Sequence, residues 1–131
     1  MKTLTRDEIL GADDLKTESV DVPEWGGAVT VRELTGTERD LWESSVVKTN
    51  GADVTIDSKN MRAKLAALCI VDDEGKRLFT EKDAIKLGEK SAAALDRVTD
   101  VARRLSRIGE VELDNLGKAS RPTRSDDSAS T

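Results

Sequence analysis

Histidine is absent from this chain of 131 residues. The commonest general base near neutral pH is therefore missing. Without histidine, Ser–His and Cys–His nucleophile pairs are also excluded. With a single cysteine as well, a zinc site of histidine and cysteine ligands cannot form within one chain. The sequence singles out no pair of carboxylates for acid–base work. We therefore expect no enzyme activity, no metal site and no cofactor.

Aromatic residues are also scarce, at 2% of the chain: Trp25, Trp42 and Phe79. The core must therefore be built from leucine, valine, isoleucine and alanine. Cys69 cannot form an intrachain disulfide, which suits a reducing cytoplasm. It falls on the apolar stripe of a predicted helix, so we expect a buried, unreactive thiol.

Long apolar runs are missing, and the chain has nothing near the roughly 18 residues of a membrane span. The first residues also lack the apolar run of a signal peptide. The net charge of -5 argues against binding to the phosphates of nucleic acid. Hydrophobic residues make up 37% of the chain and charged residues 36%. These nearly equal shares predict a globular domain with a heavily charged surface.

Apolar spacing and capping residues predict helices over five ranges: 4–10, 35–48, 58–71, 80–88 and 91–108. Thr5 with Glu8, and Thr35 with Glu38, have the spacing of capping boxes. Residues 49–57 have no period and are predicted to be a mobile loop. The segment 110–131 has the composition of a flexible polar tail.

A β-hairpin is predicted where Val20 and Val22, and then Val29 and Val31, alternate with polar residues. The turn between them, residues 23–27, contains two glycines that can take positive φ. Because a two-stranded ribbon is marginal alone, its valine face must rest on helices. We thus expect a mostly α-helical α+β domain over residues 1–109, in which the hairpin packs on about five helices.

Several motifs have an ordinary structural explanation. The run Asp72–Gly75 is too short for an EF-hand, and Gly26–Gly27 lacks the context of a phosphate loop. Four arginines are interrupted by acidic residues, which predicts a solvated helix face with an Asp100–Arg104 pair: Arg97, Arg103, Arg104 and Arg107. Trp25, in the hairpin turn, either folds back on the domain or projects as a binding anchor.

Residues 20–39 read VDVPEWGGAVTVRELTGTER. Together with the Leu4–Leu10 helix and the segments 68–79 and 87–95, they resemble the tail assembly chaperones of siphophages. The resemblance covers roughly residues 4–109. It implies a mostly helical protein with a small β-element, no cofactor and no catalytic residue.

The resemblance also implies partners. Such chaperones bind the tape measure protein, keep it soluble until tail-tube protein polymerises around it, act in the host cytoplasm and are absent from the virion. Contacts are expected from the hairpin and neighbouring helices, with these candidate residues: Trp25, Gly26, Gly27, Arg32, Leu34 and Trp42. A homo-oligomer is a further option, whereas nucleic acid and membranes are not expected partners.

Family members are often made in two lengths by a programmed frameshift. Leu116-Gly117-Lys118 can be encoded by a slippery heptamer, so this chain is interpreted as the shorter product and the longer one as a partner. The alternative function is a structural protein retained in the virion, such as a minor tail or head–tail connector component.

Overall fold

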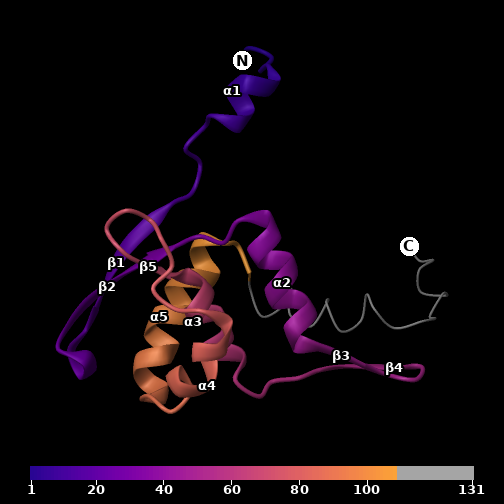
Figure 1. Ribbon diagram of the computed structural model, residues 1–131, viewed down its shortest axis with the longest axis vertical. Coiled ribbons are helices and arrows are strands. Elements are labelled where there is room, and N and C mark those ends of the chain that lie inside the picture. Colours follow the sequence, from indigo (N-terminus) through magenta and orange to yellow (C-terminus); the bar gives the residue numbers. More distant parts are fainter. Residues whose placement is uncertain (109–131) are drawn as a thin grey trace.

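The computed structural model describes residues 1–108 (Figure 1). The tail predicted for 110–131 lies outside these residues. The helices are α1 (Arg6–Leu10), α2 (Gly36–Val46), α3 (Met61–Cys69), α4 (Ala84–Leu87) and α5 (Ala92–Leu105). The strands are β1 (Thr17–Val22), β2 (Gly27–Arg32), β3 (Val47–Asn50), β4 (Asp53–Ile56) and β5 (Ile70–Val71). The predicted α+β class, mostly helical with an N-terminal hairpin, is confirmed.

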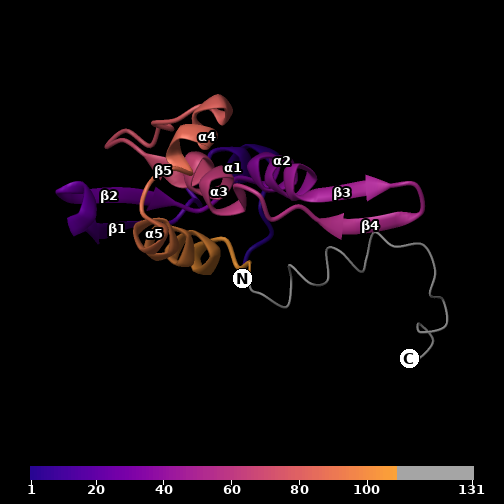
Figure 2. The same cartoon turned by 90° about the horizontal axis from the view of Figure 1, so that it is seen from below.

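The predicted hairpin is β1–β2, which pairs in the antiparallel register that puts Val20 opposite Val29. Alternation then places four valines on one face: Val20, Val22, Val29 and Val31. Three of them are buried in the core and Val29 packs against it. The valine face therefore rests on helices as expected, and α5 runs against both strands (Figure 2).

The helix predicted over 58–71 is too long. The observed helix α3 ends at Cys69, and the chain then becomes extended. Ile70 and Val71 form β5, which pairs with β2 through Val31 and Thr30 and makes a three-stranded sheet of order β1-β2-β5. Both residues are β-branched, and burial against the hairpin outweighs the helical period of the sequence. The signal for this strand is tertiary rather than local.

The prediction of a mobile loop over 49–57 is also wrong. Residues 47–56 form a second antiparallel hairpin, β3–β4, that turns at Gly51 with φ +66. Accordingly α2 stops at Val46 instead of continuing to Lys48. Figure 2 shows this ribbon at the end of the molecule opposite the first hairpin.

The core lies where α3 and α5 meet the sheet, and α2 closes one side. Its largest fully buried side chains include Trp42, Leu65 and Ile70. Cys69 is fully buried as predicted, and this burial raises the pKa of its thiol to about 12. A thiol in that environment stays protonated and unreactive at neutral pH.

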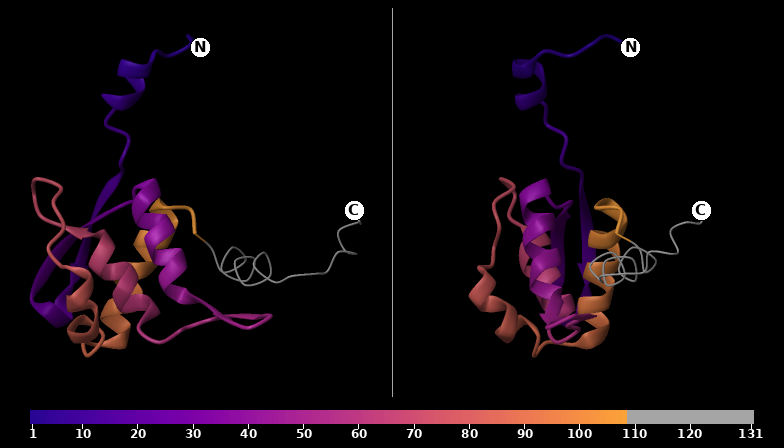
Figure 3. Two further views of the ribbon diagram at one scale, coloured as in Figure 1. Left: turned by 45° about the vertical axis from the view of Figure 1, so that its right-hand side comes forward. Right: turned by 90° about the vertical axis from the view of Figure 1, so that its right-hand side faces the viewer.

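The N-terminal helix α1 stands apart from the body of the protein (Figures 1 and 3). Its predicted capping box is present: the Glu8 backbone N–H donates to Thr5 Oγ1, and the Thr5 backbone N–H donates to Glu8 Oε1. None of its residues is buried.

Among the described residues, no helix is long and apolar enough to cross a membrane.

Candidate functional site

The tip of the first hairpin is a tight turn that determines where Trp25 points. Residues Pro23–Trp25 form a single 3-10 turn, closed by the Gly26 N–H donating to the Pro23 carbonyl at 3.0 Å. Gly26 has φ +80, in the left-handed region, while Gly27 is not among the positive-φ glycines. Trp25 consequently folds back, half-buried, against the core. Of the two alternatives left open by the sequence, the structure has the folded-back one.

Beside the indole of Trp25 lies an open cavity of about 650 Å³, which we call the Trp25 cleft. Its apolar lining comes from the turn, the chain after β5, and α4: Trp25, Leu78, Phe79 and Leu87. Four charged residues of both signs also line it: Glu24, Asp83, Lys86 and Lys90. Leu78 is 54% exposed, so the cleft offers apolar surface to solvent. Sequence reasoning missed Leu78, Phe79 and Leu87 as site residues; the adjacent pair Leu78-Phe79 in a charged segment was the available signal.

Two arginines of α5 hold the hairpin from the side. Arg97 donates to both carboxylate oxygens of Glu24 at 2.7 and 2.9 Å, and Arg104 donates to both of Glu18 at 2.9 and 2.8 Å. The hydrogen bonds from Arg97 lower the pKa of Glu24 to about 2. These two ion pairs link β1 and the hairpin turn to α5.

The predicted Asp100–Arg104 pair is therefore wrong. Arg104 reaches across to Glu18, and Asp100 accepts instead from Arg103 at 2.7 Å. A cross-element partner for Arg104 outcompetes the local one because the hairpin lies directly against this helix.

A second cavity, of about 260 Å³, lies between α2, α3 and α4, and we call it the Trp42 groove. Trp42 is 1% exposed, and its indole N–H donates to the Met61 carbonyl at 3.4 Å. It is thus part of the groove floor rather than a projecting anchor. The exposed apolar side chains along the groove are Leu41 and Ile85, at 39% and 67%.

Helix α4 separates the two cavities. Ala84 and Ile85 line the Trp42 groove, whereas Lys86 and Leu87 line the Trp25 cleft. A change to one exposed apolar side chain, Leu78 or Ile85, therefore alters one cavity and leaves the other intact.

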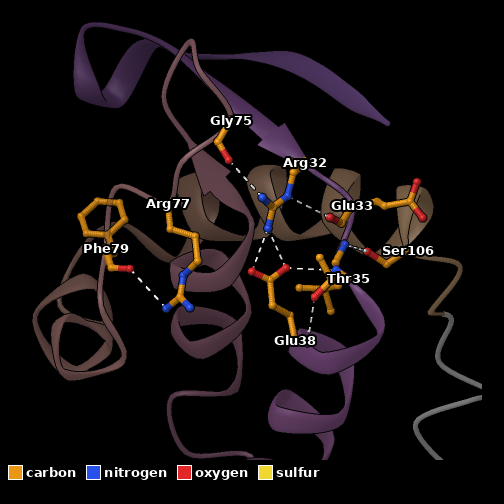
Figure 4. A network of polar contacts seen from close by, with 9 residues as sticks. Arg32, Glu33, Thr35, Glu38, Gly75, Arg77, Phe79 and Ser106 are labelled. Atoms are coloured by element: carbon orange, nitrogen blue, oxygen red, sulfur yellow. Dashed lines mark hydrogen bonds and ion pairs between the residues drawn. The ribbon is translucent and has the colours of Figure 1, made fainter. Parts of the chain in front are cut away.

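Arg32 lies at the centre of a polar network that joins three segments (Figure 4). Its guanidinium donates to both carboxylate oxygens of Glu38 at 2.6 and 2.8 Å, to the Gly75 carbonyl at 3.0 Å, and to the Glu33 carbonyl at 3.2 Å. The Arg32 and Glu38 side chains are only 12% and 14% exposed. Glu38 is also the partner of Thr35 in the second predicted capping box, which is present. Arg32 thus links the end of β2 to the start of α2.

Leu34 has a similar internal position. Its backbone N–H donates to the hydroxyl of Ser106, just after α5, at 2.9 Å, and its side chain is buried. Of the six predicted contact residues, three lie at the hairpin tip, one forms a groove floor, and Arg32 and Leu34 hold elements together. The structure does not bring the six into one surface, and a partner-binding role for each stays a prediction.

The chemistry available at these cavities is that of a binding surface. Among residues 1–108, no group of three or more histidine, cysteine, aspartate or glutamate side chains is placed to hold a metal ion. What the cavities combine is apolar area with a margin of charged residues, an arrangement typical of protein contacts.

The family model described as phage tail assembly chaperone matches residues 9–120, which is most of the chain. No curated protein and no solved structure is significantly similar to it.

Proposed function

We propose that this chain, which belongs to the phage tail assembly chaperone family, binds an apolar helical segment of the tape measure protein in the Trp25 cleft. Membership of the family supports a non-enzymatic role among tail proteins. The tape measure protein as client, and the tail-tube protein as the next partner, are our proposals. The observation that carries this function is an open apolar cleft on a chain of this family.

The cleft has the chemistry that an amphipathic helix requires. Such a helix binds by laying its apolar face into a groove, with anchors spaced at one helical turn. Trp25 and Phe79, both partly buried, form an apolar floor above the buried Leu87, and Leu78 extends it into solvent. Lysines and carboxylates at the margin suit a client whose flanking residues carry charges of either sign.

A tail assembly chaperone must also release its client when the tube forms. The cleft is open to solvent and its charged margin is exposed, so the contact area is modest and part of the attraction is screened by salt. We propose that the complex forms in the host cytoplasm and that the chaperone leaves before the virion is complete. The longer frameshift product would share the cleft, because residues 24–90 precede Lys118.

Co-expression with the tape measure protein of the same phage tests the cleft. Leu78→Glu places a charge on its exposed apolar side chain, and we expect at least tenfold less tape measure protein to co-purify. Ile85→Glu is the matched control, because Ile85 is at least as exposed (67% against 54%) but lines the other cavity. Circular dichroism should show the wild-type fold in both variants. Equal capture by both variants, or equal loss, would reject the cleft as the client site.

Protein analysis of purified virions tests the alternative, a structural tail or connector component. A chaperone should be missing from the particle, whereas detection of this chain at a fixed copy number in mature virions would favour the structural role.

A further inference from the structure

The four charged residues at the margin of the Trp25 cleft differ in whether they already have partners. Glu24 accepts two hydrogen bonds from Arg97, at 2.7 and 2.9 Å, so that guanidinium neutralises its charge. Asp83 accepts from the Thr80 backbone N–H at 2.8 Å and from the Thr80 hydroxyl at 3.1 Å. Both carboxylates are therefore used within the chain.

The two lysines at the same margin have no such bonds. Lys86, in α4, and Lys90, just after it, both line the cleft and are exposed. Within residues 1–108, neither ammonium group donates a hydrogen bond or forms an ion pair. Lys86 lies near enough to Asp83 to help lower the pKa of that carboxyl, without bonding to it. The charge that this margin still offers to a partner is thus positive.

The backbone holds the lysines on either side of an apolar residue of the cleft. The Gly88 N–H donates to the Ala84 carbonyl at 2.8 Å, and the Lys90 N–H donates to the Leu87 carbonyl at 3.1 Å. Leu87 itself lines the cleft and is buried. Because the apolar lining and the lysines belong to one short folded segment, a partner that lies in the cleft meets both.

This positive charge is local, since the whole chain has a net charge of -5. Charges on the surface of a protein act over about 8 to 10 Å before physiological salt screens them. The lysines therefore influence the residues that come into contact with the cleft, while the acidic remainder of the surface keeps the chain soluble.

We propose that the client helix in the Trp25 cleft is acidic, with carboxylates along one flank of its apolar stripe that pair with Lys86 and Lys90. This inference rests on the proposed function. It narrows the client from a helix with flanking charges of either sign to one with aspartate or glutamate facing α4. Two carboxylates one helical turn apart lie on the same face, so a single helix can offer one to each lysine. The apolar floor supplies most of the attraction, and the lysines determine which segment is chosen.

Charge reversal at the two lysines tests this choice in the co-expression experiment. Lys86→Glu/Lys90→Glu should reduce co-purified tape measure protein about tenfold, and Lys86→Gln/Lys90→Gln about threefold, because exposed ion pairs are individually weak and like charges repel. Both variants should give the circular dichroism spectrum of wild type, since the two exposed ammonium groups hold no internal bond. Unchanged capture by the Lys86→Glu/Lys90→Glu variant overturns the proposal.

Lys16→Glu/Lys76→Glu is the matched control for total charge. Both lysines are exposed and neither lines the cleft. Lys16 precedes β1, and Lys76 follows Gly75, whose carbonyl accepts from Arg32 at the end of β2. Both therefore lie at the end of the hairpin away from its turn, and this variant should capture the client like wild type. Equal losses in the two reversal variants would mean that total charge, and not the lysine pair, affects capture.

Overlapping peptides from the tape measure protein give the sharpest result. At about 25 residues each, they exceed the length below which isolated helices are marginal. Fluorescence anisotropy of labelled peptides ranks their binding to the full chain. The tightest peptide should carry aspartate or glutamate beside its apolar stripe. Changing these residues to lysine should weaken binding to wild type and restore binding to Lys86→Glu/Lys90→Glu. Tightest binding by peptides with basic flanks, or no restoration by the exchange, overturns the proposal.

Leu78→Glu separates this proposal from the proposed function. If Leu78→Glu loses capture and the lysine reversal keeps it, the cleft remains the client site and the acidic client is rejected. If Leu78→Glu captures the client like wild type, the cleft is not the client site, and the proposed function fails together with the inference that rests on it.

Discussion

The two hairpins of this protein are both antiparallel ribbons, yet their surroundings differ. The first, β1–β2, has β5 as a third strand and α5 across it, and two arginines of α5 pair with its carboxylates. The second, β3–β4, is a two-stranded sheet that projects from the end of α2 (Figure 2). A ribbon of two strands is marginal alone in water. The comparison indicates that the first hairpin is a fixed platform for the Trp25 cleft and the second opens more readily.

Truncating one buried valine in each hairpin should give the largest difference. Val31→Ala, at a fully buried position in the main core, should lower the free energy of unfolding by about 2 to 3 kcal/mol. Val54→Ala should cost about 1 kcal/mol or less, because Val54 is buried outside that core cluster and the ribbon around it can relax. Urea unfolding followed by circular dichroism measures both values. Equal losses would mean that the second hairpin is as tightly integrated as the first.

The difference between the hairpins also explains what the sequence could predict. β1–β2 has four valines at alternating positions and a turn with two glycines, so its local signal agrees with its burial. β3–β4 has a short, mixed pattern in which neither period stands out, and its pairing was missed. β5 has only two residues, and its pairing with Val31 and Thr30 depends on chain segments about 40 residues apart. Local patterns do not contain that information.

The candidate site follows the same rule. Trp25 and the two hairpin-tip glycines were identifiable because a tryptophan in a turn is unusual. Leu78, Phe79 and Leu87 were not, since only the tertiary fold brings them beside Trp25. Conversely, Arg32 and Trp42 stood out by residue type, but burial shows that the fold uses their polar groups internally. Residue type marks candidates, and exposure decides which of them can meet a partner.

The two tip glycines provide a smaller and sharper test of the platform. Gly26→Ala should destabilise the chain by about 1 kcal/mol, because φ +80 is strained for a residue with a Cβ. Gly27→Ala should be close to neutral, since Gly27 is not a positive-φ residue and a Cβ there meets no atom within 4 Å. Thermal unfolding compares the pair directly. If both substitutions cost the same, the left-handed turn is not what shapes the tip.

The smallest expected effect concerns the ion pair that holds the tip. The pKa of Glu24 is about 2 in the folded chain against an ordinary value of 4.5, because Arg97 donates to its carboxylate. A lowered folded-state pKa means that the stabilisation is complete above about pH 4.5 and is lost as the pH falls towards 2. Both side chains are partly exposed, so the loss should be small and should shrink further in high salt.

Amide hydrogen exchange at β1 and β2, read between pH 5 and 3, can measure this loosening, provided that each rate is first corrected for the intrinsic pH dependence of exchange. Glu24→Gln is the control, because it removes the titrating group and should abolish the extra opening over this window. The Arg97–Glu24 pair does not involve β3–β4. The corrected protection of its amides against exchange should therefore change less. If the tip loosens in acid as much in Glu24→Gln as in wild type, the pair does not hold the platform. The contrast between the two hairpins would then depend on apolar burial, the third strand and the Arg104–Glu18 pair.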